Sequence, residues 1–598
     1  MKKRVADILV ETLIELGINR NFCVVGGGAM HLNNAFVIHK DIKTVFCHHE
    51  QACSFAAEGY AKLTGKIATV SVTSGPGAAN AINGVYSAWV DSTPMIVISG
   101  HPRYNTTVES CGLNIRCRGV QELDIIPMVK GITKYAVMLK NPYEVKTAVI
   151  TAYNKAMSGR RGPVWISVPL DVQAALIEEE ECIAYEEEPE KDCFDIKDLD
   201  SVINLLKEAK RPIILTGSGI KYSGSVNAFY DLTKKIQVPI VGGALLSDTL
   251  PENYPLYYGL SGNIGPRTGN YIIQHSDCIL VLGNSLATRQ TGFNVEGFAP
   301  DSKIIMCDAC FDEMNKPGLN INIKIHCDLA KFIPALCNRI NDTISSNENW
   351  VKYCDNIKDF FDGYDDVKYV DEQRVPAKLF WKVFREEIPS NAVIALGNSN
   401  CTVGIYQYGL KEKDQKILTN YNAGSMGCDL PEAIGAAMGT DAPIICVTGD
   451  GSIMMNLQEL QTIRFNKFPV KIVVFSNNGY GAIRQTCKNF FNGTYTGCDE
   501  DSGISFPDFE DVAKTFGFSF FRCKCCSELM ETIKDFISFD GNAFLVVDQL
   551  LDDPVNPKIM SKLKVDGTFE TPQFTDLSPY LSEDENNILL DYENNLIK

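Results

Sequence analysis

Short apolar runs alternate with longer stretches of helical spacing along most of this chain. In the N-terminal part the runs are KTVFC, ATVSVTS and MIVISG, and glycine-containing turns and amphipathic stretches separate them. A short apolar run bounded by turn residues is typical of a strand that is buried on both faces. Strands of this kind that alternate with helices predict parallel sheets covered by helices. We therefore expect an α/β protein.

The alternation falls into three segments of similar size and a tail. A chain of 598 residues is too long for one hydrophobic core, so three domains fit the length. We expect three doubly wound parallel-sheet domains. Their predicted ranges are 1–178, 195–345 and 370–552, followed by a C-terminal tail at 553–598.

Two polar stretches mark the expected boundaries between these domains. The acidic stretch 177–192 is too charged to bury and reads as a surface connection, and the polar stretch 338–350 is the second boundary. The tail beyond Pro554 is rich in Pro, Asp and Glu, and we expect it to be irregular. The first and third segments share a theme of strand, glycine-rich turn and helix, which leaves an internal homology open.

Composition excludes some partners. The formal net charge is −18, which argues against nucleic acid or an anionic membrane as the main partner because either requires a basic face. No apolar run reaches the roughly 18 residues that span a membrane. The N-terminal stretch has the spacing of an amphipathic helix, and Asp7, Glu11 and Glu15 interrupt any signal-peptide core. We expect a cytoplasmic protein.

The 21 cysteines are scattered, many of them in apolar runs, as expected of small buried residues in a reducing compartment. Two groups have closer spacing, Cys307 with Cys310 and Cys523 with Cys525 and Cys526. Neither has a partner pair at zinc-finger spacing, so a metal or redox role is the weaker alternative for both.

The stretch 449–481 is the most informative. An apolar run, IICV, leads into Gly-Asp-Gly with Asp450 at its centre, and a second run, VKIVVF, leads into Asn477. A carboxylate and an amide oxygen at the ends of neighbouring strands can bind one Mg²⁺, which usually keeps part of its shell for phosphate oxygens. Glycines let the backbone approach a diphosphate closely. The alternative is an ordinary strand–helix–strand unit with a glycine-rich turn.

This stretch resembles the thiamine diphosphate (ThDP) binding motif, which begins at Gly-Asp-Gly and closes on an Asn. Asp450 and Asn477 are 27 positions apart, as in the motif. The resemblance implies that the metal ligands are Asp450, Asn477 and the backbone carbonyl of Gly479. It also implies that the cofactor is bound by Gly449, Gly451 and Ser452 as well as Asn477.

A second part of the chain matches the same kind of enzyme. Glu50 follows an apolar run and begins an alanine-rich helix, where a carboxylate is stabilised by the helix dipole in the simplest interpretation. However, the sequence HHEQ…AAEGYA…SGPGAAN…DSTPMIVISG resembles the pyrimidine-binding domain of acetohydroxyacid synthase and its relatives, and the resemblance covers nearly the whole chain. It implies that Glu50 hydrogen-bonds the aminopyrimidine ring, so that the cofactor supplies its own base.

Other positions carry over from the same family. Gly28, in GGGAM, is the expected backbone donor to a developing oxyanion, and Gln121 matches an active-site glutamine. The stretch 422–437 matches the part that supports the bent cofactor, with Gly424 in the turn and Met426 as the wedge between its two rings. The alternative for Met426 is core packing. The family also implies a site between two subunits, and therefore a homodimer or homotetramer.

The chain departs from the synthases where they select a large 2-oxoacid acceptor. Thr486 stands where the family has Trp, Ala482 where it has Met, and Val120 where it has Phe. All three changes widen the pocket. Arg289 is retained and is expected to contact the acceptor's carboxylate or a flavin, with a surface salt bridge as its alternative. Together with the wider pocket, the stretch IRQT…NFF and the tail DGTFETPQFTDLSPYL resemble synthase relatives of surface-polysaccharide biosynthesis. One such relative transfers an acetyl unit from pyruvate to a nucleotide-linked keto-sugar.

FAD is a further expectation. The synthases carry a non-redox FAD on the middle domain, and TGSGI at 216–220 follows an apolar run and offers a G-x-G turn. That turn is a weak signal by itself, and the retained Arg289 strengthens it.

We therefore expect a ThDP- and Mg²⁺-dependent carboligase that decarboxylates pyruvate and adds the two-carbon unit to a second carbonyl. A simple 2-oxoacid decarboxylase is the alternative, but no adjacent His-His pair follows the third strand, since His101 stands alone and His48-His49 precedes Glu50. A non-enzymatic regulatory subunit is disfavoured because Glu50 and the metal ligands are present. The expected partners are a small 2-oxoacid and a carbonyl acceptor.

Overall fold

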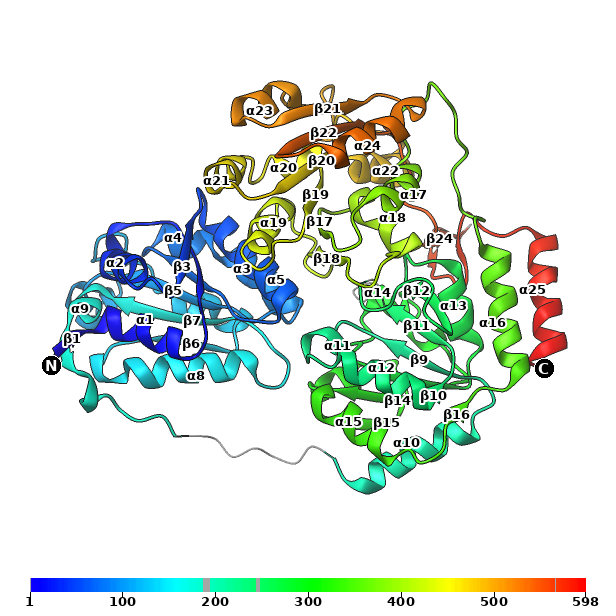
Figure 1. The fold of residues 1–598 in the computed structure, drawn as a ribbon, viewed down its shortest axis with the longest axis horizontal. Helices are drawn as coiled ribbons and strands as arrows, with labels where there is room; N and C mark the ends of the chain where they lie inside the picture. The colour runs from blue at the N-terminus through cyan, green and yellow to red at the C-terminus, as the bar shows by residue number, and fades with distance from the viewer. Residues whose placement is uncertain (1, 187–193, 244–247, 565) are drawn as a thin grey trace.

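The computed structural model describes residues 2–186, 194–243, 248–564 and 566–598, apart from the side chains of residues 562 and 563. Three six-stranded sheets dominate it, and every strand pair within them is parallel. Figure 1 shows the three sheets as separate bodies, each covered by helices, with the first at the left, the third at the top and the middle one at the lower right. The expected fold of three α/β domains is confirmed.

The first and third sheets share one topology. Numbered along each domain, both have the strand order 2-1-3-4-6-5. The first sheet contains β2 (Arg20–Cys23), β3 (Lys43–Phe46), β4 (Thr69–Val72), β5 (Ile96–His101), β6 (Tyr135–Met138) and β7 (Val164–Pro169). The third contains β17 (Val393–Leu396), β18 (Lys416–Thr419), β19 (Ile444–Gly449), β20 (Val470–Ser476), β21 (Ser519–Cys523) and β22 (Ala543–Asp548). The shared theme in the sequence thus corresponds to a shared strand order.

The middle sheet is wound differently. Its order is β12-β11-β9-β13-β14-β15, so the chain reverses direction across the sheet between β9 and β13. In such sheets ligands bind outside the carboxyl ends of the strands, at this switch point. The strands are β9 (Pro212–Thr216), β11 (Ile240–Gly243), β12 (Tyr257–Ser261), β13 (Cys278–Leu282), β14 (Lys303–Asp308) and β15 (Ile321–His326).

Helices cover both faces of these sheets. The longer ones are α1 (Val5–Glu15), α2 (Met30–Ile38), α3 (Glu50–Thr64), α5 (Ile82–Val90), α8 (Val145–Met157), α10 (Ile196–Glu208), α12 (Val226–Lys235), α13 (Arg267–His275), α15 (Leu329–Arg339), α16 (Glu348–Phe361), α17 (Ala377–Glu387), α18 (Asn400–Tyr408), α19 (Asp429–Ala437), α22 (Gly481–Phe490), α24 (Leu529–Ser538) and α25 (Glu583–Leu596). Within the described residues, no helix is both long and apolar enough to cross a membrane.

Two helices join the first and third domains. Helix α3 crosses α19, and glycines at the crossing let the backbones approach closely. A Cβ added at Gly435 would lie 2.0 Å from the carbonyl oxygen of Ala56, and one at Gly59 would lie 2.5 Å from that of Glu432. Neither glycine can be replaced without moving a helix. The apolar faces of the two domains merge here into one core.

The C-terminal tail is irregular only in part, since its described residues before Glu583 are mostly turn and coil and those from Glu583 to Leu596 form a helix, which corrects the expectation from its composition. It forms four two-residue strands and the helix α25, which lies beside α16 against the middle domain (Figure 1). Ser582 caps α25 with a capping box that includes Glu585, whose carboxylate also accepts a hydrogen bond from the Tyr364 hydroxyl. The tail therefore extends the middle domain.

The middle domain also extends beyond the polar stretch expected to end it. That stretch leads into α16, and Trp350 in α16 is fully buried against the middle sheet. The acidic connection between the first two domains lies partly outside the described residues, at 187–193.

Candidate active site

The predicted metal ligands are brought together at the ends of β19 and β20. Asp450 directly follows β19, and its Oδ2 accepts hydrogen bonds from the backbone N–H groups of Asn477 at 3.0 Å and Gly479 at 3.2 Å. Its Oδ1 accepts from the N–H of Gly451 at 2.9 Å. Parallel neighbouring strands place these residues side by side, as the sequence pattern indicates.

The donor set fits a hard cation. The side-chain Oδ1 of Asn477 is buried and has no hydrogen-bond partner among the described residues, although a buried acceptor normally has one. Asp450 is 3% exposed, and burial raises its pKa to about 6 against the lowering effect of its backbone hydrogen bonds. A cation at this place would bind the free amide oxygen and favour the ionised carboxylate.

An arginine that sequence reasoning missed holds this loop in place. Arg484, in α22, is 5% exposed, and its guanidinium donates to the carbonyl oxygen of Asn477 at 2.9 Å and to that of Leu551. Gly479 has φ of 155° and packs so tightly that a Cβ there would lie 2.0 Å from the Cys498 carbonyl oxygen. These contacts therefore hold the loop in place from within its own domain.

The turn that carries Met426 is tied to the same strand end. Gly424 and Gly427 both have positive φ, which allows the tight turn. The N–H of Gly427 donates to Oγ of Ser452 at 2.8 Å, and Ser452 donates in turn to Asp429 at 2.7 Å. Burial raises the pKa of Asp429. Ser452, expected on the cofactor, thus also supports the turn beside the metal clamp.

The second half of the site lies in the first domain. Glu50 begins α3, and its Oε2 accepts a hydrogen bond from Asn80 at 3.0 Å. The turn after β4 lies beside it, because a Cβ at Gly77 would be 3.0 Å from Oε1 of Glu50. The N–H of Gly28 donates to the Thr73 hydroxyl of that turn at 3.1 Å.

Gln121 reaches the same turn. A Cβ on Gly75 would lie 2.6 Å from the carbonyl oxygen of Gln121, so the backbones are in contact. Gln121 itself has a positive φ of 53° and is exposed, and Val120 beside it is 85% exposed. The structure therefore gathers Gly28, Glu50 and Gln121 around one loop.

The substrate positions lie on an exposed face of α22. Ala482 and Thr486 are one turn apart and both are exposed, and the Thr486 hydroxyl donates back to the Ala482 carbonyl at 3.0 Å. The opposite face of the helix is buried through Arg484 and Cys487. The face that the sequence predicts to select the acceptor is therefore free of other parts of its own chain.

Arg289 lies beside the Met426 turn, and none of the described acidic side chains forms a salt bridge with it. Its guanidinium stacks over the Tyr421 ring at 4.5 Å, and a Cβ on Gly424 would be 3.9 Å from its Nη2. This middle-domain side chain thus reaches the turn of the third domain that the sequence predicts to support the cofactor.

The two cysteine groups lie on and beside the strands β14 and β21. Among the described residues, no cluster of three His, Cys, Asp or Glu side chains could hold a metal. Cys307, Cys523 and Cys526 are buried, and burial raises the pKa of Cys523 to about 12. Its thiol therefore stays protonated and unreactive at neutral pH.

Comparison with protein-family models agrees with this geometry. Residues 3–128 match the N-terminal TPP binding domain of thiamine pyrophosphate enzymes, residues 199–336 match the central domain, and residues 397–547 match the C-terminal TPP binding domain. Together these matches cover more than half of the chain in the family's order. The chain belongs to the thiamine pyrophosphate enzyme family.

Its similarity within that family is to acetolactate synthases. The chain is 28% identical over 517 residues to the acetolactate synthase isozyme 2 large subunit of Escherichia coli K12, covering 86% of this chain and 89% of the relative. It is 28% identical over 557 residues to a probable acetolactate synthase large subunit of Methanococcus aeolicus, covering 90% of each. It is 29% identical over 581 residues to acetolactate synthase 1 of Nicotiana tabacum, covering 93% of this chain and 83% of the relative. The chain is a ThDP-dependent enzyme of the acetolactate synthase type.

Proposed function

We propose that this enzyme decarboxylates pyruvate and joins the remaining two-carbon unit to a second carbonyl compound, with ThDP held through Mg²⁺. The observation that favours ligation over simple decarboxylation concerns two histidines, His49 and His101. Nδ1 of His49 accepts the N–H of Gln51 at 3.1 Å as the cap of α3, and His101 is 2% exposed with Nδ1 3.3 Å from the Pro102 carbonyl. His49 is thus engaged as a helix cap through Nδ1 and His101 is buried, which supports a bound two-carbon unit that persists until an acceptor arrives.

Bound ThDP supplies the electron sink for decarboxylation, and the chain's residues hold it and direct protons. Asp450, Asn477 and the Gly479 carbonyl would bind Mg²⁺, for which the free Oδ1 of Asn477 is the support. Glu50 would bind the aminopyrimidine ring and move its proton. The N–H of Gly28 would donate to the oxygen that gains charge once the Thr73 hydroxyl releases it.

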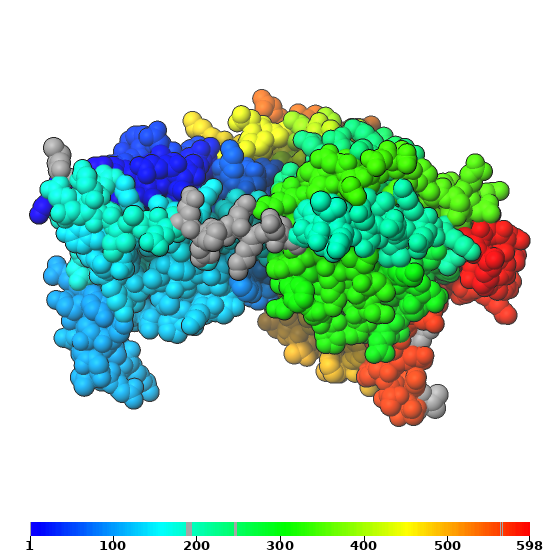
Figure 2. All heavy atoms as spheres, turned by 90° about the horizontal axis from the view of Figure 1, so that it is seen from below, coloured from blue at the N-terminus to red at the C-terminus, as the bar shows by residue number. Residues whose placement is uncertain are grey.

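We propose a homodimer, or a tetramer built from dimers, with the site between two chains. The described contacts of Glu50 are within its own domain, and none joins it to Asp450 or Asn477. Figure 2 shows two lobes, one coloured as the segment near residue 110 and one as the tail near residue 570, that project from the same side of the molecule. Val120 and Phe490 are 85% and 59% exposed, and a second chain would cover such apolar side chains.

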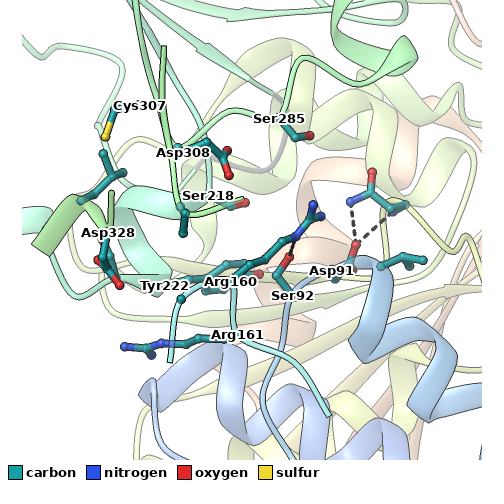
Figure 3. Close-up of a pocket in the computed structure, with 18 residues that line it drawn as sticks. Asp91, Ser92, Arg160, Arg161, Ser218, Tyr222, Ser285, Cys307, Asp308 and Asp328 are labelled. Carbon is teal, nitrogen blue, oxygen red and sulfur yellow. Dashed lines mark hydrogen bonds between the residues drawn. The ribbon is translucent and has the colours of Figure 1, made fainter. Parts of the chain in front are cut away.

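We propose FAD as a non-redox cofactor of the middle domain. A groove lies at the switch point between β9 and β13, where cavities of about 110 and 60 Å³ share Ser218, Ser285 and Asn422. The carboxylates of Asp308 and Asp328 border it and can accept hydrogen bonds from ribose hydroxyls (Figure 3). The donor set thus fits a dinucleotide, and the absorbance spectrum of cofactor released from the purified protein tests the proposal.

A nucleotide-linked keto-sugar is the alternative acceptor. The support is the face of α22 with the small side chains Ala482 and Thr486, which leaves room for more than a small 2-oxoacid.

The proposal is tested by mass spectrometry of products formed from pyruvate. The purified chain with ThDP and Mg²⁺ is given a panel of 2-oxoacids, aldehydes and nucleotide-linked keto-sugars. We expect a product that contains the acceptor plus two carbons. Acetaldehyde as the sole product with every acceptor would overturn ligation and leave decarboxylation.

A further inference from the structure

Four ionisable side chains are buried together where the first and third domains meet. The Nζ of Lys62 lies 2.7 Å from Glu58, 3.1 Å from Asp91 and 3.1 Å from Glu432. None of the four is more than 3% exposed. Burial raises the pKa of Glu432 to about 8, so that this carboxyl is protonated at neutral pH and relieves part of the charge imbalance. Burying ions costs desolvation free energy, and a buried ion cluster stabilises a fold poorly. We therefore expect a role of this cluster other than stability.

One set of hydrogen bonds runs from this cluster to the turn 419–426. Lys62 donates to the backbone carbonyl of Thr419 at 2.6 Å. The other carboxylate oxygen of Asp91 accepts from the backbone and side-chain N–H groups of Asn422 at 3.3 and 2.8 Å. Figure 3 draws both of these as dashed lines beside Asp91. The start and the middle of the turn are thus fixed by the first domain.

A second set reaches the same turn independently. The Ser87 hydroxyl lies 2.8 and 2.6 Å from the two carboxylate oxygens of Glu58, to which it donates, and the side chain of Asn420 donates to Ser87. The Oδ1 of Asn420 accepts the N–H of Ser425 at 3.0 Å. Ser425 directly precedes Met426, so this chain of bonds ends beside the side chain expected to support the cofactor.

We propose that Lys62 is a positioning residue that holds the turn 419–426, and with it Met426, in place for ThDP from the neighbouring domain. The proposal rests on the proposed role of Met426. Glu50, Ser54, Glu58 and Lys62 follow one another at four-residue spacing and form one stripe along α3. One helix therefore presents the proposed cofactor-activating carboxylate at its start and anchors the cofactor-supporting turn near its end.

Loss of Lys62 would weaken two sets of hydrogen bonds that hold the turn 419–426, one through Asp91 and one through Glu58. The carboxylates would lose their only cation among the described contacts and repel one another, so Asp91 and Glu58 would move from their partners. Asn422 and Asn420 would then lose the acceptors that fix them. The metal clamp contacts none of these side chains, so the diphosphate end of the site would stay formed.

The test compares Lys62→Met, Lys62→Arg and the control Arg267→Met. Arg267 is 1% exposed and pairs with Asp365 at 3.0 Å, so its loss breaks an ion pair of similar burial away from the turn. ThDP is titrated into the cofactor-free full chain with saturating Mg²⁺, and tryptophan fluorescence reports binding without any substrate. We expect half-saturation to rise at least tenfold in Lys62→Met and to stay within threefold of the unaltered chain in the other two.

Half-saturation within threefold in a folded Lys62→Met would overturn the proposal. If that variant does not fold, the exposed Asn422 provides the second test. Asn422→Ala removes the side-chain hydrogen bond to Asp91 and leaves the buried ionisable side chains unchanged. We expect at least a threefold rise there, and an unchanged value would also overturn the proposal. ThDP binding is measured without pyruvate, so the two proposals can fail separately. If the chain binds ThDP but forms no ligated product, the proposed function is overturned and the role of Lys62 is not.

Discussion

The backbone N–H of Asn477 donates to Oδ2 of Asp450 over 3.0 Å, while the buried side-chain Oδ1 of Asn477 has no partner in the part of the chain that the structure describes. The two residues follow neighbouring parallel strands, β19 and β20. The protein thus satisfies the carboxylate with backbone N–H groups and leaves the amide oxygen for a ligand. Leaving a buried acceptor without a partner costs about 1–3 kcal/mol, which a bound cation would recover.

Replacement of Asn477 by Ala therefore separates stability from metal binding. We expect the metal-free Asn477→Ala protein to unfold at the same temperature as the unaltered chain or a higher one, because an unsatisfied buried group is removed. The Mg²⁺ concentration for half-maximal activity should rise at least tenfold. Metal titration of activity and metal-free thermal unfolding check the two parts. An unchanged Mg²⁺ requirement would contradict the assigned ligand, and the exposed Asn489→Ala serves as the control.

Glu50→Gln should remove activity without removing the cofactor. Proton transfer by a positioned side chain contributes roughly 10²–10⁴-fold, so we expect kcat to fall by about that factor. The metal clamp is unaffected, and ThDP half-saturation should stay within a few-fold. Asn80→Ala, which removes the hydrogen bond to Glu50 at 3.0 Å, should give a smaller loss. Full activity in Glu50→Gln would exclude the assigned role.

The strand ends that form the metal clamp could be predicted because the information is local. IICV before Asp450 and VKIVVF before Asn477 are short apolar runs with a turn signal directly after each. Parallel strands then place their carboxyl ends at one edge. The helix α25 also had a local signal that composition hid, since Ser582 and Glu585 have the spacing of a capping box.

The supporting side chains could not be predicted in this way. Lys62 donates to a carbonyl 357 positions further along the chain, and Arg484 to one 67 positions away. No periodicity relates such residues, because the contact depends on how two domains pack. The sequence placed Arg289 beside the acceptor or a flavin, with a surface salt bridge as the alternative, and only the fold shows its contact with the Tyr421 ring.

Gly435→Ala should be strongly destabilising. The added Cβ would lie 2.0 Å from the Ala56 carbonyl oxygen, so α3 and α19 must separate. Overpacking of this kind costs typically 1–3 kcal/mol, and we expect a clearly lowered unfolding temperature. Gly131→Ala is the matched control, because nothing lies within 4 Å of its added Cβ. Equal unfolding temperatures for the two variants would contradict the close crossing.

Glu432 should make the protein less stable as pH rises. Burial raises its pKa from 4.5 to about 8, and that of Glu58 is raised as well. Below about pH 4.5 the carboxyl is protonated in both states, and its contribution is fully present. Between pH 4.5 and 8 the unfolded chain releases a proton that the folded chain keeps, so stability falls until the folded pKa is passed.

Glu432→Gln removes this titration. We expect its unfolding temperature to fall less between pH 6 and 8 than that of the unaltered chain, since one such group contributes up to about 1.4 kcal/mol per pH unit. Thermal unfolding at several pH values measures the slope. The exposed Glu583→Gln should retain the original slope, and an identical slope in Glu432→Gln would show that this carboxyl does not hold a proton in the folded protein.

Thr486→Trp should change which acceptor is used. Thr486 is exposed on the same face of α22 as Ala482, so a large ring there fills space beside the proposed site without disturbing the core. We expect the ratio of product from a small 2-oxoacid to product from a nucleotide-linked keto-sugar to rise at least tenfold, because the larger acceptor loses its room. Lys488→Trp places the same ring about 200° around the helix and should leave the ratio unchanged. Competition assays with both acceptors and pyruvate measure it, and equal ratios in the two variants would show that this face does not contact the acceptor.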